Sequence, residues 1–366
     1  MSLEGFSAAQ IAHAQASSLD LFIKGPFKEI GIQDKPLLRI MEAGAKDFSG
    51  AKENISLPVR FERGANGVND GLKGYSHRQK VGFYEPGNGR RANYIWREHH
   101  HGFTLSETEL KTQGILVGDE FGSVSRSRGD RGITVLAGIM ESANRDFMER
   151  YAETANTLFW GDGTADTSAL HGILAFIADI PTIGTTGGIS RATNPRWRNR
   201  SRTAAFFGHA SYDAKWGGNK ITSNVANGGA LWQELGKEYR QLRRFGAKPN
   251  RFLAGSDFID ACEREIRANG NYSEVGFTKN QDGSIGEMKF KGMDVEYDPT
   301  LDDMGRAKWA YIWDDRLIYL QKLSGDWKRL RDPARPYDQF VLHKSMVCTG
   351  QVVSDQLDGA LVVELN

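Results

Sequence analysis

The sequence has few cysteines, no long apolar run and almost no net charge, and each absence argues against a class of protein. The two cysteines among 366 residues, Cys262 and Cys348, form neither a disulfide framework nor a metal-binding pattern. Each has apolar neighbours, so we expect buried, reduced thiols in a cytosolic protein. No stretch of 18 apolar residues occurs, which argues against a transmembrane helix. The first residues lack the basic start and apolar core of a secretory signal, so we expect none.

The charges nearly cancel, because 47 lysines and arginines face 46 acids. A dedicated nucleic-acid-binding protein usually carries a clear basic excess, so this balance argues against that class. The sequence also lacks a Ser/His/Asp, Cys/His or paired-carboxylate arrangement that would predict an enzyme. Glycine, in contrast, is abundant: its 42 residues are about 11% of the chain against a usual ~7%. Much of it lies in predicted loops, which indicates bent or closely apposed backbone.

Three short motifs resemble ligand sites, and each has a simpler interpretation. Glu98 and the three histidines after it could bind zinc or nickel. Adjacent strand residues face opposite sides, however, so only His99 and His101 share a face, and we favour a structural or interfacial role, sensitive to pH near the histidine pKa of ~6.5. The acids of 162–166 lack the further ligands of a calcium loop and predict a turn. The glycines of 184–188 lack the Gly-Lys-Ser/Thr of a phosphate-binding loop. We predict no metal and no cofactor.

The order of predicted elements is mixed, without regular βαβα alternation, and indicates an α+β fold. An amphipathic helix is predicted over Ala8–Phe22, and a half-buried strand begins at Leu57. Two more strands, Gln79–Tyr84 and Ala92–Arg97, are predicted on either side of the turn-rich Glu85–Arg91. A protruding hairpin of this kind has too little core to be stable alone in water, so we expect it to need a partner surface.

The strongest element is a helix predicted over residues 132–160. Its apolar stripe has three-to-four spacing and includes Phe147 and Tyr151, Asp130 can cap its start, and Gly161 is a good stop. About 29 residues at ~1.5 Å rise give a length of roughly 43 Å, which is long for a compact domain. The opposite side carries charges typical of a solvated or interfacial face: Glu141, Arg145, Asp146, Glu149, Arg150 and Glu153.

Later segments predict alternating helices and strands. A second helix runs from about Thr222 to Gly246, and a short buried strand follows Lys248-Pro-Asn. A third helix, capped by Ser256, stops at Gly270. Alternating apolar residues predict β-structure at Met288–Tyr297, Lys308–Gln321, Gln339–Val353 and Leu361–Leu365.

The stretch from Ala169 to Thr203 carries the most informative motif. A small apolar segment leads into a Gly-rich turn and then into a tryptophan among arginines. It resembles the string GGI-(D/S)-R-(S/A)-T-N-P-x-W-R, which is common in major capsid proteins of tailed bacteriophages. Taken alone, the segment also fits a basic surface loop with a buried Trp anchor. The matching residues are Gly188, Ile189, Arg191, Thr193, Asn194, Pro195, Trp197 and Arg198.

Other segments resemble the same family in the same order, so the resemblance covers about residues 56–366. The helix at 132–160 has the length and position of the family's spine helix. Lys308–Gln321 resembles the family's x-Y-x-W-D-x-x-x-L stretch, and an F-x-G-x-P-V-x-x-D-P signature is present with Asp294 in place of its first proline. The residues that match this signature are Phe290, Gly292, Val295, Asp298 and Pro299.

The resemblance implies the Hong Kong 97-type major capsid fold, with an N-terminal arm, an extension loop, a peripheral domain and an axial domain. The arm covers 1–55 and the extension-loop region 56–106. The peripheral domain, which contains the spine helix 132–160, combines 107–168, 284–300 and 335–366. The axial domain combines 169–283 and 301–334.

The implied function is structural and not enzymatic. Copies of the chain would form hexamers and pentamers of the icosahedral head shell that encloses phage double-stranded DNA, in a virion assembled in the bacterial host cytoplasm. The near-neutral charge suits a wall that contains DNA without sequence-specific binding. Expected partners are the chain itself, a portal protein, a cement protein and a separate scaffolding protein, because the arm is too short to hold a scaffolding segment; no membrane is involved. We predict no cross-linking by Lys73 or Lys80, since no acceptor is evident.

The candidate contacts between subunits are charged residues of the loop, the long helix and the basic segment. Residues 191–202 contain five arginines and no acid. We predict that these arginines pair with acids of another subunit, in preference to nucleic-acid phosphates. The full candidate set is Arg90, Arg91, Arg128, Asp130, Arg145, Glu149, Arg196 and Arg198.

Two alternatives stay open on the sequence. One is an encapsulin-like compartment, which uses the same fold to enclose enzymes. The other is a metal-dependent soluble enzyme with its metal at His99, His101 and a distant carboxylate.

Overall fold

The structure is a computed structural model, and it describes residues 34–50, 53–59, 74–80, 89–106, 108, 129–164, 166, 168–223, 230–268, 288–334 and 341–366. Side chains are described for these residues except 129–142, 144, 332–334 and 342. The helix predicted over Ala8–Phe22, the strand residues 81–84, the tip residues 85–88, Arg128 and the side chain of Asp130 lie outside this part. The described part contains no helix that is both long and apolar enough to cross a bilayer.

The chain forms two compact units, each built from segments distant in sequence. Among the described residues, unit 1 draws on Glu98–Ala155 and Gly325–Cys348. Unit 2 draws on Asp34–Arg97, Asn156–Ser324 and Thr349–Asn366. Helices and sheets are mixed throughout, as the α+β prediction requires. The four-part division into arm, extension loop, peripheral and axial domains is drawn at other residues and stays a prediction.

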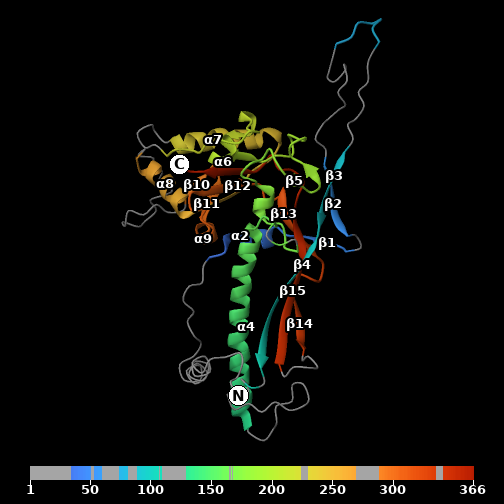
Figure 1. The fold of residues 1–366 in the computed structure, drawn as a ribbon, viewed down its shortest axis with the longest axis vertical. Helices are drawn as coiled ribbons and strands as arrows, with labels where there is room; N and C mark the ends of the chain where they lie inside the picture. The colour runs from blue at the N-terminus through green and yellow to red at the C-terminus, as the bar shows by residue number, and fades with distance from the viewer. Residues whose placement is uncertain are drawn as a thin grey trace. The chain divides into compact units, whose positions relative to one another are not determined.

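The long helix α4 spans Gly129–Trp160, so the predicted 132–160 helix is confirmed (Figure 1). It stops where predicted, because the Gly161 amide donates to the carbonyls of Thr157 and Leu158 at 3.1 and 3.0 Å. In unit 1 its stripe residues Phe147 and Tyr151 are buried. The strands of that unit are β4 (Arg97–Ser106), β14 (Arg329–Ala334) and the first part of β15 (Val341–Ser354), with which both of the others pair.

Unit 2 is organised around a seven-stranded sheet. Strand β9 lies parallel to β11 and antiparallel to β12, and β16 lies antiparallel to β12 and parallel to β7. Strands β12 and β16 are nearly continuous apolar runs because both of their faces are buried. In spatial order the strands are β10 (Lys289–Phe290), β11 (Met293–Tyr297), β9 (Arg251–Ala254), β12 (Trp309–Trp313), β16 (Leu361–Glu364), β7 (Arg200–Arg202) and β8 (Gly217–Gly218).

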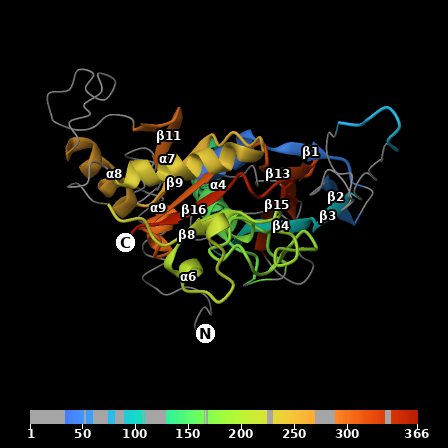
Figure 2. The ribbon, with the colours of Figure 1, turned by 90° about the horizontal axis from the view of Figure 1, so that it is seen from above.

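Helices α7 (Ala230–Leu242) and α8 (Ser256–Ala268) pack on this sheet (Figures 1 and 2). Leu231 and Leu235 of α7 join Phe258 of α8 and the sheet residue Phe252 in one buried core. Within the described residues the predicted second helix covers Ala230–Leu242, and a 3₁₀ turn, Arg243–Phe245, completes it before Gly246, whose φ is +95°. The predicted Ser256 cap is instead the first helical residue, and its amide donates to Asp302 Oδ1 at 3.0 Å.

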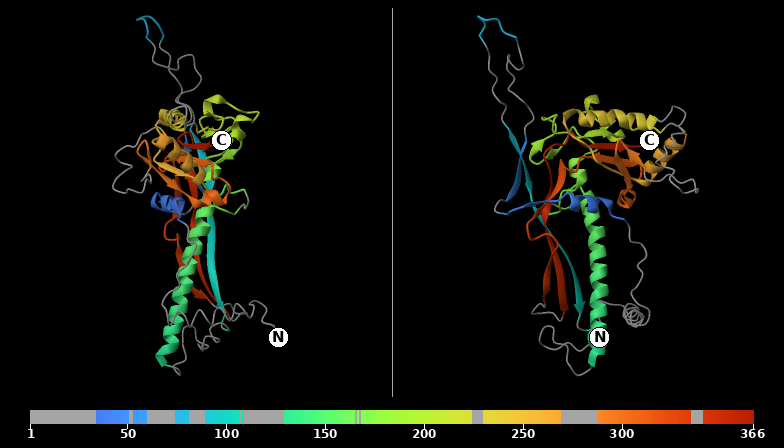
Figure 3. Two further views of the ribbon diagram at one scale, coloured as in Figure 1. Left: turned by 90° about the vertical axis from the view of Figure 1, so that its left-hand side faces the viewer. Right: turned by 180° about the vertical axis from the view of Figure 1, so that it is seen from behind.

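The strand predicted over 92–97 pairs with an earlier segment of the chain, and residues 81–84 of its predicted hairpin partner lie outside the described residues. Strand β3 (Arg90–Ile95) pairs antiparallel with β2 (Asn54–Val59) (Figure 1 and the right view of Figure 3). The predicted partner does not begin at Gln79, because the Gln79 amide closes a turn on the Ser76 carbonyl at 2.8 Å. Alternation on β3 buries Ala92 and Tyr94, whose hydroxyl donates to the Ser354 carbonyl at 2.9 Å.

The β-structure predicted as one strand over Met288–Tyr297 is a hairpin of β10 and β11. Lys291 and Gly292 have φ of +51° and +87°, as the two central residues of a type I′ turn require. A second small hairpin joins β5 (Thr185–Thr186) to β6 (Ile189–Ser190) through Gly187 and Gly188, with φ of +59° and +75°. The Gly-rich turn predicted there is confirmed.

The remaining elements are short. Strand β13 (Ile318–Leu323) pairs antiparallel with the end of β15 and parallel with β1 (Lys46–Phe48). The predicted Lys308–Gln321 β-structure is thus split between β12 and β13. The short helices are α2 (Pro36–Ala43), α5 (Ile173–Phe176), α6 (Ala204–Phe207) and α9 (Pro299–Asp303), with a 3₁₀ turn at Ala214–Trp216.

Candidate functional site

The motif segment forms a loop folded around Arg191, which we call the Arg191 loop and define as residues 184–199. The side chain of Arg191 is 2% exposed. Its Nη2 donates to the carbonyls of Ala175 and Phe176 at 2.8 and 2.9 Å. Its Nε donates to Thr186 Oγ1 at 3.0 Å, and its Nη1 donates to Asn199 Oδ1 at 3.1 Å. A rigid planar guanidinium thus joins α5, the small hairpin and the start of β7.

All four acceptors of Arg191 are neutral oxygens. No carboxylate compensates its charge within these contacts, and burial lowers its pKa to about 10. A buried charge without an opposite charge is expensive, so it persists only where the hydrogen bonds are complete and well aligned. The four hydrogen bonds of Arg191 therefore hold the Arg191 loop in one conformation.

Two further motif residues hold the same loop. Trp197 is fully buried, and its indole Nε1 donates to the Thr186 carbonyl at 3.0 Å. Arg198 is 8% exposed and donates from Nε to the Arg191 carbonyl at 2.7 Å and from Nη2 to the Ala192 carbonyl at 2.8 Å. The buried tryptophan anchor is confirmed. The Arg198 guanidinium is largely used inside its own chain.

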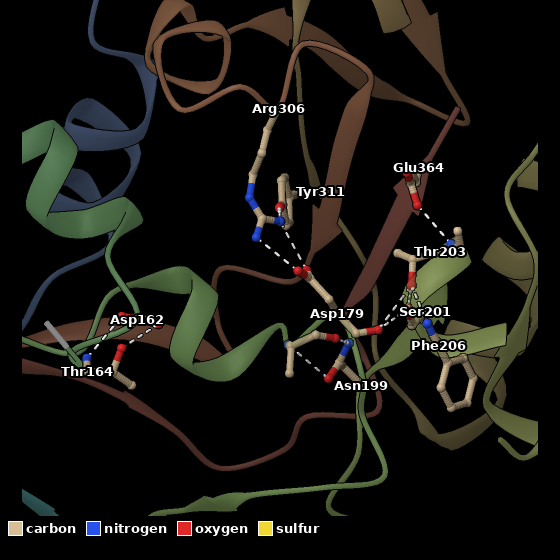
Figure 4. Close-up of polar contacts among 12 residues, drawn as sticks. Asp162, Thr164, Asp179, Asn199, Ser201, Thr203, Phe206, Arg306, Tyr311 and Glu364 are labelled. Atoms are coloured by element: carbon tan, nitrogen blue, oxygen red, sulfur yellow. Dashed lines mark hydrogen bonds and ion pairs between the residues drawn. The ribbon is translucent and has the colours of Figure 1, made fainter. Parts of the chain in front are cut away.

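Figure 4 shows how Asp179 ties this region to the sheet of unit 2. The Asp179 carbonyl accepts hydrogen bonds from Ser201 Oγ at 2.6 Å and Thr203 Oγ1 at 3.2 Å. Its carboxylate accepts two hydrogen bonds from Arg306, which also donates to the Tyr311 hydroxyl. Asn199 Nδ2 donates to the Ala178 carbonyl at 2.9 Å, next to Asp179. Loop, strand β7 and strand β12 are thus fixed to one another.

The arginines of β7 correct the prediction that the basic segment pairs with another subunit. Arg200 Nε lies 2.5 Å from Glu238 Oε2, and both side chains are at least 90% buried. Arg202 Nη2 lies 3.1 Å from Glu234 Oε2. Both acids belong to α7 of the same chain, one helical turn apart, so they face the same strand. The acids that neutralise Arg200 and Arg202 thus lie on the distant helix α7, and not within residues 191–202.

The other candidate contacts differ in exposure. Arg90, Arg91, Arg145 and Arg196 are exposed, and Glu149 is half-buried. The Arg196 guanidinium lies over the Phe245 ring at 4.0 Å. Of the described members of the predicted set, these five present more surface than Arg198 to a partner.

The histidine cluster lies on β4 and alternates as expected. His99 and His101 are half-buried on one face, while His100 on the other is exposed. The His101 ring stacks on Phe147 with centroids 4.7 Å apart. Within the described residues, no group of three His, Cys, Asp or Glu side chains could hold a metal ion. A packing role accounts for His101.

The acids at 162–166 make turns, as predicted. Asp162 accepts from the Thr164 amide at 2.9 Å and from its hydroxyl at 2.8 Å (Figure 4). These hydrogen bonds lower the pKa of the Asp162 carboxyl. Asp166 Oδ1 accepts from the Ser168 amide at 2.8 Å.

Sequence reasoning missed Asp179, Asn199 and Glu238. Asp179 follows an apolar run without a motif, and Glu238 resembles any charge on an amphipathic helix. Asn199 directly follows the Trp-Arg pair, which was a usable signal. Asp314, in the recognised W-D pair, was also not assigned a role; it accepts from the Lys248 amide at 2.8 Å and fixes the Lys-Pro-Asn loop.

No protein-family model and no curated protein matches the chain. Solved structures do match. One is the capsid asymmetric unit of cyanophage A-1(L), with TM-score 0.62, 16% identity, and coverage of 93% of this chain and 94% of that one. Another is the capsid of Myoviridae phage XM1, with TM-score 0.52, 10% identity, and 93% and 95% coverage. The SrpI encapsulin of Synechococcus elongatus also matches, at 10% identity and 94% coverage of each chain, but its TM-score of 0.47 is too low to support a conclusion.

These likenesses establish the fold. The chain has the fold of phage capsid proteins along nearly its whole length.

Proposed function

We propose that this protein is the structural subunit of a phage head shell and works by contacting copies of itself. One observation carries the proposal: the match to the cyanophage A-1(L) capsid structure extends over 93% of this chain and 94% of the other. Hexamers and pentamers, closed icosahedral symmetry and enclosed double-stranded DNA are the finer parts of the proposal.

The two-stranded β2–β3 sheet supports a role in contacts between subunits. One face, with Ala92 and Tyr94, packs within unit 2. The opposite face carries exposed Arg91 and Ile95, and Ile95 is 53% exposed. An isolated two-stranded sheet is marginal in water, so a second subunit covering this face would stabilise it. Many modest contacts of this kind combine through multivalency in a closed shell.

The remaining partners are proposed on the same basis. Arg90, Arg145, Glu149 and Arg196 are further candidate contacts between subunits, and Arg198, Arg128 and Asp130 stay in the predicted set. We propose a separate scaffolding protein, a portal protein, a cement protein and packaged DNA bound without sequence specificity. The virion is the proposed location, with assembly in the host cytoplasm.

Negative-stain electron microscopy with sedimentation velocity tests the proposal. The protein is expressed alone and together with its neighbouring genes. We expect closed shells, or rings of five or six 40.7 kDa chains. A monomer that persists under every condition, with a scaffolding partner present, would contradict the proposal. Shells that enclose an enzyme in place of DNA would assign the chain to a compartment.

A further inference from the structure

Two large apolar side chains, Tyr297 and Met304, lie exposed on one part of unit 2. Tyr297 is the last residue of β11 and Met304 caps the end of α9, and the two residues are 44% and 37% exposed. The Tyr297 hydroxyl donates to Asp302 Oδ2 at 2.7 Å, and the Ser256 amide donates to Asp302 Oδ1 at 3.0 Å. Asp302 thus joins the end of β11 to α9 and to the start of α8. We call this surface the α8–α9 face and define it as Asp257, Tyr297, Asp302, Asp303 and Met304.

The charge of the α8–α9 face is negative. Asp257 and Asp303 are exposed, and Asp302 accepts from the two neutral donors Tyr297 and Ser256. Neither Asp257 nor Asp302 forms an ion pair within the described residues. The hydrogen bond to Asp302, with the acids around it, raises the pKa of the Tyr297 hydroxyl to about 12. An apolar centre bordered by charges of one sign is the composition of a contact between proteins, in which tyrosine and methionine are enriched.

The outer side of β3 has the complementary character. Arg91, Asn93 and Ile95 are all exposed and lie on one side of the strand because strand residues alternate, and we call them the β3 face. Arg91 forms no ion pair within the described part of the chain. Strands β2 and β3 lie on the opposite side of unit 2 from α8 and α9 (Figures 1 and 2). Two matching faces on opposite sides of one body suit head-to-tail contacts between copies.

We propose that the β3 face of one copy docks on the α8–α9 face of a second copy. Ile95 packs against Tyr297 and Met304, and Arg91 meets the acids around them. Two β3 faces, or two α8–α9 faces, would bring like charges together, whereas the mixed pair brings opposite charges together. Head-to-tail contacts of one kind close into a ring when each step is the same rotation about one axis. The inference rests on the proposed function, and it names the surface that receives the β3 face.

Disulfide cross-linking of the full chain tests the contact. The double variant Ile95→Cys/Met304→Cys is oxidised mildly at low salt and analysed on a non-reducing gel. Because its two new cysteines lie on opposite sides of unit 2, only a contact between copies can join them, and each join requires Cα atoms within about 7 Å. We expect a ladder of covalent multimers that extends beyond the dimer, and no ladder from either single variant.

The matched control is Ile95→Cys/Ile183→Cys. Ile183 is 44% exposed on unit 2 and belongs to neither face, so this variant should cross-link at the background rate. The native cysteines, Cys262 and Cys348, are buried and do not compete.

Charge reversal in the Ile95→Cys/Met304→Cys background tests the complementarity. Arg91→Glu and Asp257→Lys should each slow the formation of the ladder at least about fivefold. Together they should restore most of the rate, because the charges are then opposite again. Asp294→Lys is the control: Asp294 is exposed at the other end of β11, outside the α8–α9 face, and its reversal should leave the rate unchanged.

Equal ladders from the two double-cysteine variants, or dimers from Ile95→Cys alone, would overturn the proposal. Binding of a short DNA duplex that Arg91→Glu abolishes, without any ladder, would assign the β3 face to nucleic acid. Electron microscopy of the wild type separates this inference from the proposed function. Rings or shells without a ladder would contradict this contact alone, and the absence of both would contradict both. A ladder without rings or shells would support the contact and refute the closed shell.

Discussion

Arg306 and Asp179 form a two-point ion pair, with Nη1–Oδ1 at 3.0 Å and Nη2–Oδ2 at 2.9 Å. They lie 127 residues apart in the sequence. The guanidinium also lies over the Trp309 ring at 4.4 Å. Planar, two-point geometry of this kind is the strongest arrangement available to an arginine and a carboxylate. The pair therefore fastens the segment before the Arg191 loop to the sheet of unit 2.

A double-mutant cycle measures this pair. Asp179→Ala and Arg306→Ala should each lower the free energy of unfolding, with a coupling energy of about 1–2 kcal/mol. Urea unfolding followed by tryptophan fluorescence provides the measurement. The control pair is Arg39 and Glu296, which is shorter at 2.6 Å but has Arg39 64% exposed. Its coupling should stay below about 0.5 kcal/mol. Equal couplings would show that burial and two-point geometry do not strengthen the Arg306–Asp179 pair.

Arg191→Lys should be far more damaging than its conservative chemistry implies. A lysine has three donors on one atom and cannot reach the four oxygens that Arg191 contacts. Unpaired buried carbonyls and a buried ammonium should lower the free energy of unfolding by about 2–4 kcal/mol. Arg196→Lys, on the exposed part of the same loop, should change it by less than about 0.5 kcal/mol. Thermal unfolding of both variants tests this, and similar melting temperatures would contradict the role assigned to Arg191.

Gly187→Ala and Gly188→Ala separate backbone strain from steric contact. Both glycines have positive φ, so alanine strains either position. At Gly187 the added Cβ would also lie 2.9 Å from Tyr94 Cζ, whereas at Gly188 it would meet nothing within 4 Å. We expect a loss of about 1 kcal/mol at Gly188 and a clearly larger one at Gly187. Equal losses in chemical denaturation would show that Tyr94 moves away freely.

Asp358 should make stability depend on pH between about 4 and 6. Burial raises the pKa of its carboxyl from 3.8 to about 6. In that interval the folded state holds a proton that the unfolded state releases, so stability falls as pH rises and levels off above 6. Asp358→Asn should remove this contribution and be more stable by on the order of 2–3 kcal/mol at pH 7. The measurement is the difference in unfolding free energy between variant and wild type across pH 4–8. A difference that does not change with pH would refute the shift.

Arg91→Glu should block assembly without unfolding the subunit. Arg91 is exposed on the outer face of β3. In the proposed shell this face contacts acids of a neighbouring subunit, which a negative charge at position 91 would repel. Because a shell repeats every contact many times, a loss of ~1.4 kcal/mol per contact raises the concentration needed for assembly at least tenfold. Light scattering measures assembly and circular dichroism measures folding. Arg240→Glu on exposed α7 is the control. Normal assembly by Arg91→Glu would remove this face from the proposed interface.

Several features follow from local sequence. The period of 3.6 residues in α4 places Phe147 and Tyr151 on one buried stripe regardless of what covers them. The paired glycines at 187 and 188 allow the positive φ of a tight hairpin. The alternative interpretation of the motif segment, a basic loop with a buried Trp anchor, is right about the anchor, because Trp197 is fully buried. The motif order then indicated a capsid fold, which the structural likeness supports.

Partner choice required the tertiary structure. The sequence offered five arginines between 191 and 202 without saying which oxygens they meet. Arg200 finds Glu238 on a helix 38 residues away, and Arg191 finds two carbonyls of α5. The pairing of β3 with β2 was likewise undetermined. Periodicity fixes which face of an element is apolar, but hydrogen bonds between distant segments depend on how the whole chain packs. The sequence by itself therefore determined the elements and their buried faces, and only the tertiary structure decided which charges are used within the subunit and which stay exposed.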